Sequence, residues 1–472
     1  MSLKFKIFPI AFFVFSIGFS QSTSVKKYTL NECIAIALEN NLDLKSSKLR
    51  ANSAKINFQQ SKANILPSIN GSYNIGINDG RSIDPFTNDF INQELTFSNA
   101  RLDLDAVIFN GFRLINTVKQ ERLNRLASEH EIDEAEQNLI LDVTLAYLQV
   151  LNNSDVLELA NKRLEVTNNQ LKRQEEIYQE EVGNPADYTD IKAQKTLDET
   201  NILNLKSALN NSKLNLTRLL NLDETISIEA NDLLLNLERY EFSPEDVFND
   251  ALNGLATFKA KETRIKAVKK GISIAKAQFT PQISAFAGLN TNYSSLAETF
   301  TATGTNIIET GDFVTIDNQD VPVLKEQTVF EGHKIGYRDQ FDNNLSTVVG
   351  LSVSLPIFNG FRAKNNVALE KIKLEESRIE LDRTRQEIKN TISQVYFDMD
   401  ASYMRYQSLM KQVEAFKESY RINEIRFNNG VSNFLAYITS KNNLDNSKTN
   451  LTNAKYEYLL LVKVLEYYRG NF

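Results

Sequence analysis

The sequence predicts a mainly α-helical, internally duplicated fold with a membrane β-barrel portion, built from long helical hairpins and four β-strands per protomer. Three observations lead to this fold class. The 472 residues include only 17 Gly and 8 Pro and no Trp, so few residues break helices. Four segments alternate apolar and polar residues over about ten positions, enough for a tilted strand to cross a bilayer. One hexapeptide, Ile-Phe-Asn-Gly-Phe-Arg, occurs twice, at 108–113 and 357–362.

The repeated hexapeptide marks an internal duplication. Residues 29–78 match 243–292 at a constant offset, and both begin with a hydroxyl residue followed three positions later by an acid, as in a helix capping box. The hexapeptides have a larger offset, because the second copy has gained about 35 residues between its strands. We therefore expect a first structural repeat, 21–242, and a second, 243–472, each with a helix, two strands and a long helical hairpin. An Asn-Gly pair predicts the turn from strand to hairpin in each copy, at Asn110, Gly111, Asn359 and Gly360.

The amino terminus predicts export. Residues 1–20 contain two lysines, an apolar run and small residues before Gln21, which is the pattern of a secretory signal peptide. A lipoprotein would carry a cysteine directly after that run, but the single cysteine, Cys33, lies inside the first helical pattern. We expect an exported chain without N-terminal lipid or an intrachain disulfide.

Net charge and hydropathy argue against a nucleic-acid partner and against a membrane-spanning helix in the mature chain. A net charge of −7 argues against a nucleic-acid partner, which would select a basic surface. After the signal peptide, no run reaches the roughly 18 apolar residues of a membrane helix. A β-barrel is therefore the expected way into a membrane.

The alternating segments are the predicted strands, and they lie near 68–78, 100–109, 283–293 and 347–357. Alternation alone fits four half-buried strands of a soluble sheet equally well. Helix length favours the membrane, because the predicted helices are far too long to cover such a sheet. The polar connections 79–99 and 294–345 are expected to be solvent loops.

Helical patterns fill the rest of each repeat. The predicted helices are 28–64, 113–181, 188–220, 362–429 and 433–468, with a short strand expected at 226–228. The two longest patterns contain no proline, and 69 residues of helix span roughly 100 Å. Leu and Tyr recur at heptad spacing in 113–181 and in 433–468, which indicates coiled-coil packing. Gly183 and Gly430 mark the breaks, which we expect to be the tips of helical hairpins.

The residues that carry most enzyme chemistry are scarce. The chain has two histidines, His130 in a charged helix and His333 in a loop, and a single cysteine. We find no metal-ligand cluster, no Gly-rich phosphate loop and no nucleophile with a base. Carboxylates abound, but on coiled coils they usually form a solvated face. We expect neither an enzyme nor a cofactor or metal site.

Four strands cannot close a membrane barrel by themselves, because open strand edges are not tolerated in lipid. A dimer would supply eight strands and a trimer twelve. Eight strands fill their interior with side chains, whereas a polar conduit needs more. We therefore expect a homotrimer in contact with outer-membrane lipid.

Several short motifs recur in a duplicated order across the mature chain: Tyr28 to Cys33, Leu66 to Ile69, the two Ile-Phe-Asn-Gly copies, Ala146-Tyr147, Phe427-x-x-Gly430 and Leu444-Asp445. In this order they resemble the TolC-type outer-membrane efflux protein family, the outer membrane factors. The resemblance implies a trimer whose strands form one outer-membrane barrel and whose helical hairpins form an α-barrel, which is a periplasmic tunnel. It also implies a passive exit duct of a tripartite efflux or type I secretion system, docked to a periplasmic adaptor protein and an inner-membrane transporter.

Two other classes of protein share the long helices. A periplasmic adaptor also carries helical hairpins, but it usually adds Gly- and Val-rich lipoyl-like and barrel domains that we do not find. A structural coiled-coil protein would leave the matched strands without a purpose. Localisation in the outer membrane of a Gram-negative-type cell, with a periplasmic helical domain, would favour the duct.

The resemblance also indicates a gate at the hairpin tips, where this chain departs from the family. Related second tips read Tyr-x-x-Gly, with aspartates six and nine positions after the Gly. Here Phe427 precedes Gly430, and the aspartate positions hold Ala436 and Thr439. Acids remain at the first tip, Asp187 and Asp190, where three protomers would gather six carboxylates and favour cations. Our hypothesis is a gate held by apolar contacts of Phe427 with Asp190 setting ion preference; alternatively, both acids only cap the following helix.

Overall fold

The computed structural model describes residues 27–181, 184–224, 226–229 and 237–471. The predicted signal peptide and the turn residue Gly183 lie outside the described residues. The chain divides into two compact units. In the described residues, the first unit takes 27–49, 131–258 and 384–471, and the second takes 50–130 and 259–383. Each unit draws on both predicted repeats, so the repeat boundary at residue 242 is not a boundary between units.

The first helix of each repeat begins with a capping box. α1 (Leu30–Asn40) follows Thr29, whose hydroxyl accepts a hydrogen bond from the Glu32 amide, while the Glu32 carboxylate accepts one from the Thr29 amide. α5 (Pro244–Gly254) begins in the same way after Ser243. These reciprocal bonds satisfy amides that have no partner within the helix.

The single helix predicted over 28–64 is in fact two helices, because the chain breaks at Asn41. The Asn41 side chain accepts hydrogen bonds of 2.9 and 3.1 Å from two amides of α2 (Leu42–Ala63). Asparagine competes with the helix backbone in this way and favours caps over helix interiors. The second repeat breaks at the matching position, Leu255, before α6 (Ala256–Lys276).

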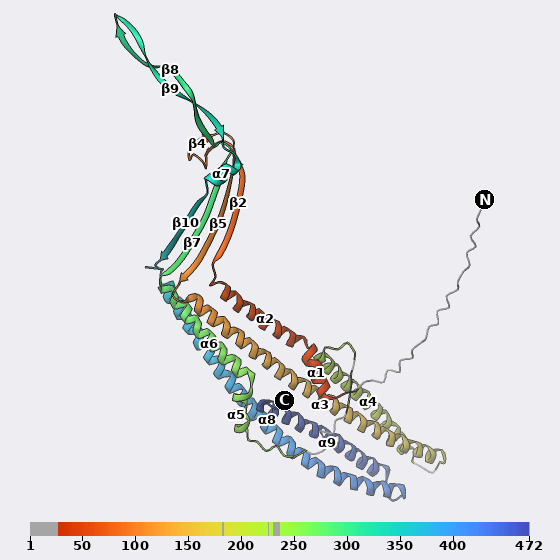
Figure 1. The fold of residues 1–472 in the computed structure, drawn as a ribbon. Coiled ribbons are helices and arrows are strands. Elements are labelled where there is room, and N and C mark those ends of the chain that lie inside the picture. Colours follow the sequence, from red (N-terminus) through yellow and green to blue (C-terminus); the bar gives the residue numbers. More distant parts are fainter. Residues whose placement is uncertain (1–26, 182–183, 225, 230–236, 472) are drawn as a thin grey trace, which may run out of the picture. The chain divides into compact units, whose positions relative to one another are not determined.

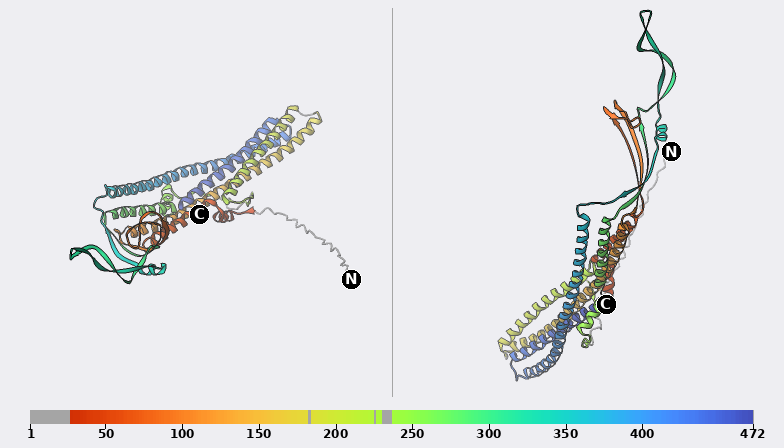
Figure 2. Two further views of the ribbon diagram at one scale, coloured as in Figure 1. Left: turned by 90° about the horizontal axis from the view of Figure 1, so that it is seen from above. Right: turned by 90° about the vertical axis from the view of Figure 1, so that its left-hand side faces the viewer.

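Two long helical hairpins account for most of the chain. They are formed by α3 (Arg113–Gln179) with α4 (Pro185–Leu220) and by α8 (Arg362–Asn428) with α9 (Phe434–Arg469). α4 begins before the predicted residue 188, because Asn184 caps it and Pro185 suits the first turn of a helix. Within the first unit the parts of these helices lie side by side in Figures 1 and 2. No helix in the described part of the chain combines the length and the apolar character needed to cross a membrane.

The hydrophobic core of the first unit lies where α1 packs against α3 and α4. Its fully buried side chains include Cys33, Ala37, Val143, Val150, Leu216 and Leu220. Beside this core, β1 (Lys27–Tyr28) pairs in parallel with β6 (Ser227–Ile228).

The second unit contains a four-stranded antiparallel sheet in the order β10-β7-β5-β2 (Figure 1). Its strands are β2 (Ser68–Asn78), β5 (Leu95–Phe109), β7 (Gln282–Ser294) and β10 (Ser346–Ser354). β5 starts at Leu95 rather than at 100, because the added residues pair with Asn74 to Asn78 of β2. β10 ends before the predicted residue 357, since Pro356 has no amide hydrogen to donate to a neighbouring strand.

The segment 294–345, predicted to be a solvent loop, contains a long β-hairpin instead. β8 (Glu298–Ile316) pairs with β9 (Gln319–Lys334) through the turn Asp317-Asn318, whose φ angles are 52° and 63°. Two positive φ angles are typical of the type I′ turn, which matches the twist of the strands. Both faces of this hairpin are largely exposed, so its sequence needs no continuous apolar face and reads as polar. The remaining short elements are β3 (Arg81–Ile83), β4 (Phe90–Asn92), a 3₁₀ helix (Ala277–Phe279) and α7 (Tyr337–Asn343).

Candidate functional site

The two Asn-Gly turns have the same backbone geometry. In the first copy, Gly111 and Phe112 have φ angles of 65° and 62°, and the Asn110 carbonyl accepts a hydrogen bond of 3.2 Å from the Arg113 amide. The second copy repeats this arrangement at Asn359, Gly360, Phe361 and Arg362. In each turn the left-handed conformation is therefore adopted by the glycine and by the phenylalanine that follows it. The asparagine does not adopt it, although asparagine tolerates this conformation better than most residues. These turns connect the strands to α3 and α8 and lie in the second unit, whereas the predicted tip residues lie in the first.

The described part of the first tip begins at the start of α4. The Asn184 side chain accepts from the Ala186 amide at 3.1 Å and donates to an Asp187 carboxylate oxygen at 3.4 Å. Burial raises the pKa of Asp187, and the negative charge of Asp190 raises it further. Asp187 is half-buried and Asp190 is exposed. Asn184 is thus the cap, and Asp190 is directed to solvent in this protomer.

The second tip is closed by Gly430, which has a φ of 71°. Its amide donates to the Phe427 carbonyl at 3.0 Å, a helix-ending arrangement that favours glycine. Of the two positions where related proteins carry aspartates, Ala436 is half-buried and Thr439 is exposed. The Ala436 amide donates to the side chain of Asn433, which caps α9, at 2.9 Å.

Phe427 belongs to a tip aromatic cluster within its own chain. Its ring stacks on Tyr437 with a centroid separation of 4.9 Å and lies 5.9 Å from the ring of Phe434. Phe434 and Tyr437 are buried together with Ile191 of α4. This cluster therefore brings residues of both hairpins into contact near their tips.

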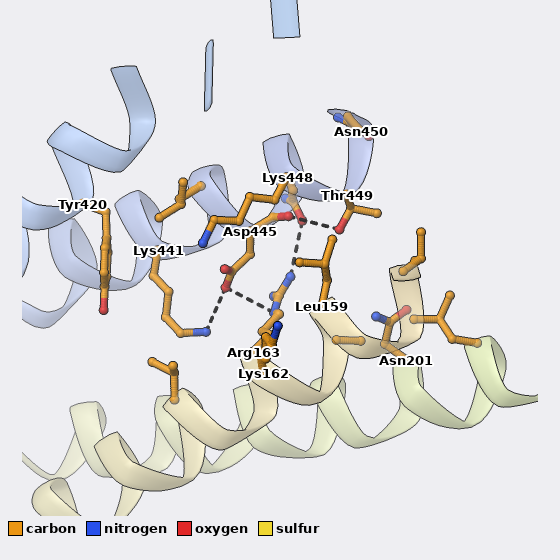
Figure 3. A pocket seen from close by; sticks show the side chains of 16 residues that line it. Leu159, Lys162, Arg163, Asn201, Tyr420, Lys441, Asp445, Lys448, Thr449 and Asn450 are labelled. Carbon is orange, nitrogen blue, oxygen red and sulfur yellow. Dashed lines mark hydrogen bonds and ion pairs between the residues drawn. The ribbon is translucent and has the colours of Figure 1, made fainter. Parts of the chain in front are cut away.

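A second group of residues joins the hairpins further from the tips, and Figure 3 shows three of them, Arg163, Lys441 and Asp445. We call Arg163 of α3, Asp198 of α4, and Lys441 and Asp445 of α9 the charged cluster. Arg163 Nε lies 2.8 Å from an Asp198 oxygen and 3.8 Å from an Asp445 oxygen, and Lys441 Nζ lies 3.1 Å from the same Asp445 oxygen. The side chains of Asp198 and Lys441 are only 2% and 3% exposed.

Neutral side chains complete the charged cluster. The Thr167 hydroxyl donates to Asp198 at 2.6 Å and accepts from Lys441 at 3.2 Å. The Gln194 amide donates to the other Asp198 oxygen at 2.8 Å. The cluster therefore has paired charges and a hydrogen-bonded connection from α4 through α3 to α9.

Sequence reasoning found only part of this arrangement. Leu444-Asp445 is one of the motifs of the sequence, and Leu197-Asp198 matches it 247 residues earlier in the first repeat. Arg163 and Lys441 belong to no such motif, and charged residues on coiled coils are usually solvated. One feature of the sequence could have pointed to Lys441. It lies four residues before Asp445, the same position that Gln194 occupies before Asp198 in the first repeat.

A cavity of 480 Å³ lies beside the charged cluster, between α3, α4 and α9. Lys162, Lys448 and Asn201 add polar groups to its lining, and Leu159 and Leu205 add apolar ones. Within the described ranges, no group of three or more His, Cys, Asp or Glu side chains could hold a metal ion. The arrangement suits holding helices together rather than performing a reaction.

Comparison with known proteins places both hairpins and the strands in one family pattern. The family model described as outer membrane efflux protein matches residues 33–222 and 247–466. The outer membrane efflux protein BepC of Brucella suis biovar 1 (strain 1330) is 21% identical over 374 residues, which are 79% of this chain and 70% of BepC. The outer membrane protein TolC of Escherichia coli (strain K12) is 21% identical over 464 residues, which are 96% of this chain and 84% of TolC.

Solved structures share the fold. VceC from Vibrio cholerae superimposes with a TM-score of 0.74 at 18% identity, covering 93% of this chain and 96% of VceC. The open state of the MtrE channel of Neisseria gonorrhoeae gives a TM-score of 0.72 at 17% identity, covering 94% of this chain and 89% of MtrE. The fold class predicted from the sequence, with long helical hairpins and a few strands, is thereby confirmed.

Proposed function

We propose, since this chain belongs to the outer membrane efflux protein family, that it is the homotrimeric, passive exit duct of an assembly with a periplasmic adaptor protein and an inner-membrane transporter. The chain is an efflux channel of the outer membrane. Family members are trimeric channels that work with adaptor and pump partners, and they are not enzymes. The observation that carries the proposal is the family match, which covers both hairpins and both strand pairs. It favours the duct over a periplasmic adaptor.

The open edges of the sheet support the trimer. β2 and β10 are the outer strands of the sheet, and neither has a further partner among the described residues. Apolar side chains on both are more than half exposed, including Ile75 at 67% and Val349 at 77%. Unpaired strand edges cannot face lipid, so three copies of the four-stranded sheet would close on one another as twelve strands.

The assembly can be tested directly in native membranes. Crosslinking should yield trimers, and the trimer should dissociate on heating in detergent. A predominant dimer, or a monomer that resists heating in detergent, would exclude this assembly.

The tips are the proposed gate and the proposed contact with the partners. Gly183, Asp187, Asp190, Phe427, Gly430, Ala436 and Thr439 are its candidate residues. Without carboxylates at Ala436 and Thr439, closure would depend on apolar contacts, and the stacking of Phe427 on Tyr437 supports this. Exposed Asp190 would set ion preference.

Single-channel recording in planar bilayers tests this gate. Phe427→Ala should raise the open probability, because it removes a ring from the tip aromatic cluster, and Asp190→Asn should weaken cation selectivity. Leu435→Ala is a matched control, since Leu435 lies at the same tip but is 69% exposed. If Phe427→Ala behaves like Leu435→Ala, the gate lies elsewhere.

A further inference from the structure

We propose that the charged cluster is a clasp: it holds the two helical hairpins of a protomer together and confines their separation to the segments between the cluster and the tips. The proposal rests on the proposed function, because separation at the tips is what would open the duct. Arg163, Asp198, Lys441 and Asp445 would thus be positioning residues for conduction.

The first argument is the place of the cluster along the helices. Asp198 lies in the fourth turn of α4 and Asp445 in the fourth turn of α9, counted from the tip ends at Pro185 and Phe434. The tip aromatic cluster lies between these turns and the tips. Each hairpin therefore has a short terminal segment beyond the charged cluster.

The second argument is that one cation serves both hairpins. Arg163 stands between Asp198 of its own hairpin and Asp445 of the other, at 2.8 and 3.8 Å. These aspartates occupy matching positions of the two repeats, but only α9 also supplies a lysine. The Thr167 hydroxyl joins the two halves, because it donates to Asp198 and accepts from Lys441.

The third argument is energetic. Moving α9 away from α3 would break the hydrogen bond from buried Lys441 to Thr167 and the ion pair between Arg163 and Asp445. Each cation would then keep a single carboxylate, Asp445 for Lys441 and Asp198 for Arg163. Separating buried charges from their partners is strongly unfavourable, whereas exposed ion pairs contribute little. The cluster holds two cations and two anions and is complete within the chain. Separating the helices at the tip aromatic cluster should cost less, because apolar and stacking contacts are less directional and tolerate small displacements.

Hydrogen exchange measured by mass spectrometry on the purified trimer in detergent tests the clasp. In Arg163→Met, amides of residues 446–456 should exchange at least about tenfold faster than in the wild type, because opening then extends past the cluster. Glu158→Gln is the matched control: it breaks the neighbouring Lys162–Glu158 pair, whose side chains are 66% and 64% exposed, and should leave exchange unchanged.

Asp445→Asn provides a second arm that preserves side-chain shape. It should also raise exchange over 446–456, because it leaves buried Lys441 without its carboxylate partner although Asp198 still pairs with Arg163. In the double variant Arg163→Met/Asp445→Asn, the increase should be less than the product of the two single effects, because both changes act on one cluster. Unchanged exchange over 446–456 in both single variants, with the trimer intact, would overturn the clasp.

The exchange experiment does not depend on transport. A wild-type trimer that never conducts in planar bilayers would count against the proposed duct. The clasp would still hold if exchange over 446–456 rises in the Arg163→Met and Asp445→Asn variants. A conducting wild type whose Arg163→Met and Asp445→Asn variants both keep wild-type exchange would reject the clasp alone.

Discussion

At the residue scale, Tyr147 shows how one buried hydroxyl ties separate segments to the core of the first unit. Its side chain is 1% exposed, and its hydroxyl donates to the backbone carbonyls of Tyr28 at 3.3 Å and Glu229 at 2.5 Å. These carbonyls belong to β1 and to the residue that follows β6. The Tyr147 hydroxyl therefore connects α3 to both short strands, in addition to the packing of Tyr28 and Ile228 against the same core.

Replacing Tyr147 with Phe should destabilise the protein by about 1–3 kcal/mol, because two carbonyls lose a buried donor while the ring volume is kept. The measurement is thermal unfolding of the detergent-solubilised trimer followed by circular dichroism. Tyr178→Phe is the control, since the Tyr178 ring is 45% exposed and stacks on Tyr188. Equal melting temperatures for the Tyr147→Phe variant and the wild type would contradict the assigned role.

The same tyrosine predicts a loss of stability at alkaline pH. Burial raises the pKa of the Tyr147 phenol from 10.0 to about 12, with smaller contributions from the negative charges of Cys33, Glu229 and Glu32. The unfolded chain therefore releases this proton first, so the stabilisation is complete below pH 10 and is lost as the pH rises toward about 12. Stability measured between these pH values should fall less steeply in Tyr147→Phe than in the wild type. An equally steep fall in both would assign the alkaline loss to other groups.

At the scale of elements, the sequence predicted the bounds of helices best where an apolar repeat extends over many residues. It predicted them worst where the hydrogen bonds of a single side chain end a helix. The long helices were predicted to within a few residues, because a proline-free heptad pattern leaves little choice. The break at Asn41 was missed, because the sequence does not show that the Asn41 side chain accepts hydrogen bonds from the first amides of α2. The β8–β9 hairpin was missed because a ribbon exposed on both faces needs no alternation.

The duplicated turn offers a matched pair of glycines. Gly111 and Gly360 have φ angles of 65° and 62°, so alanine should cost about 1–2 kcal/mol at either position. At Gly111, however, the added carbon would lie 1.9 Å from Thr280 Oγ1, whereas no atom lies within 4 Å at Gly360. Gly111→Ala should therefore lower the melting temperature more than Gly360→Ala, and Thr280→Ala should recover part of the difference. Equal effects of the two alanines would show that the Thr280 contact relaxes freely.

The β8–β9 hairpin should be dispensable for the sheet. β8 and β9 pair with each other and with no further strand in the described part of the chain, and the Ile335 amide donates to the Ala297 carbonyl at 3.0 Å where the hairpin begins. Replacing Glu298–Lys334 with Asn-Gly should thus close a tight turn and leave trimer yield and single-channel conductance unchanged. Loss of the heat-sensitive trimer in this variant would show that the hairpin contributes to assembly.

At the scale of the whole molecule, the efflux channel follows from the combination of duplicated strand pairs and long hairpins rather than from any reactive group. The candidate residues of the second tip, Phe427, Ala436 and Thr439, were proposed from their spacing to Gly430, which needs only the sequence. The charged cluster needed the structure, because Arg163 and Asp445 are far apart in the chain and their charges look solvated in isolation. A channel of this kind must expose one part of the chain outside the cell and another to the periplasm.

Labelling of single cysteines in intact cells tests that claim most directly. The native Cys33 is fully buried, and burial raises its thiol pKa to about 11, so a membrane-impermeant maleimide should not modify the wild type. Asp317→Cys, in the turn of the β8–β9 hairpin, should be labelled in intact cells. Val431→Cys, which is 66% exposed between α8 and α9, should be labelled only after the outer membrane is permeabilised. Labelling of Val431→Cys but not Asp317→Cys in intact cells, or equal labelling of both, would contradict a duct that spans the outer membrane with its helical tips in the periplasm.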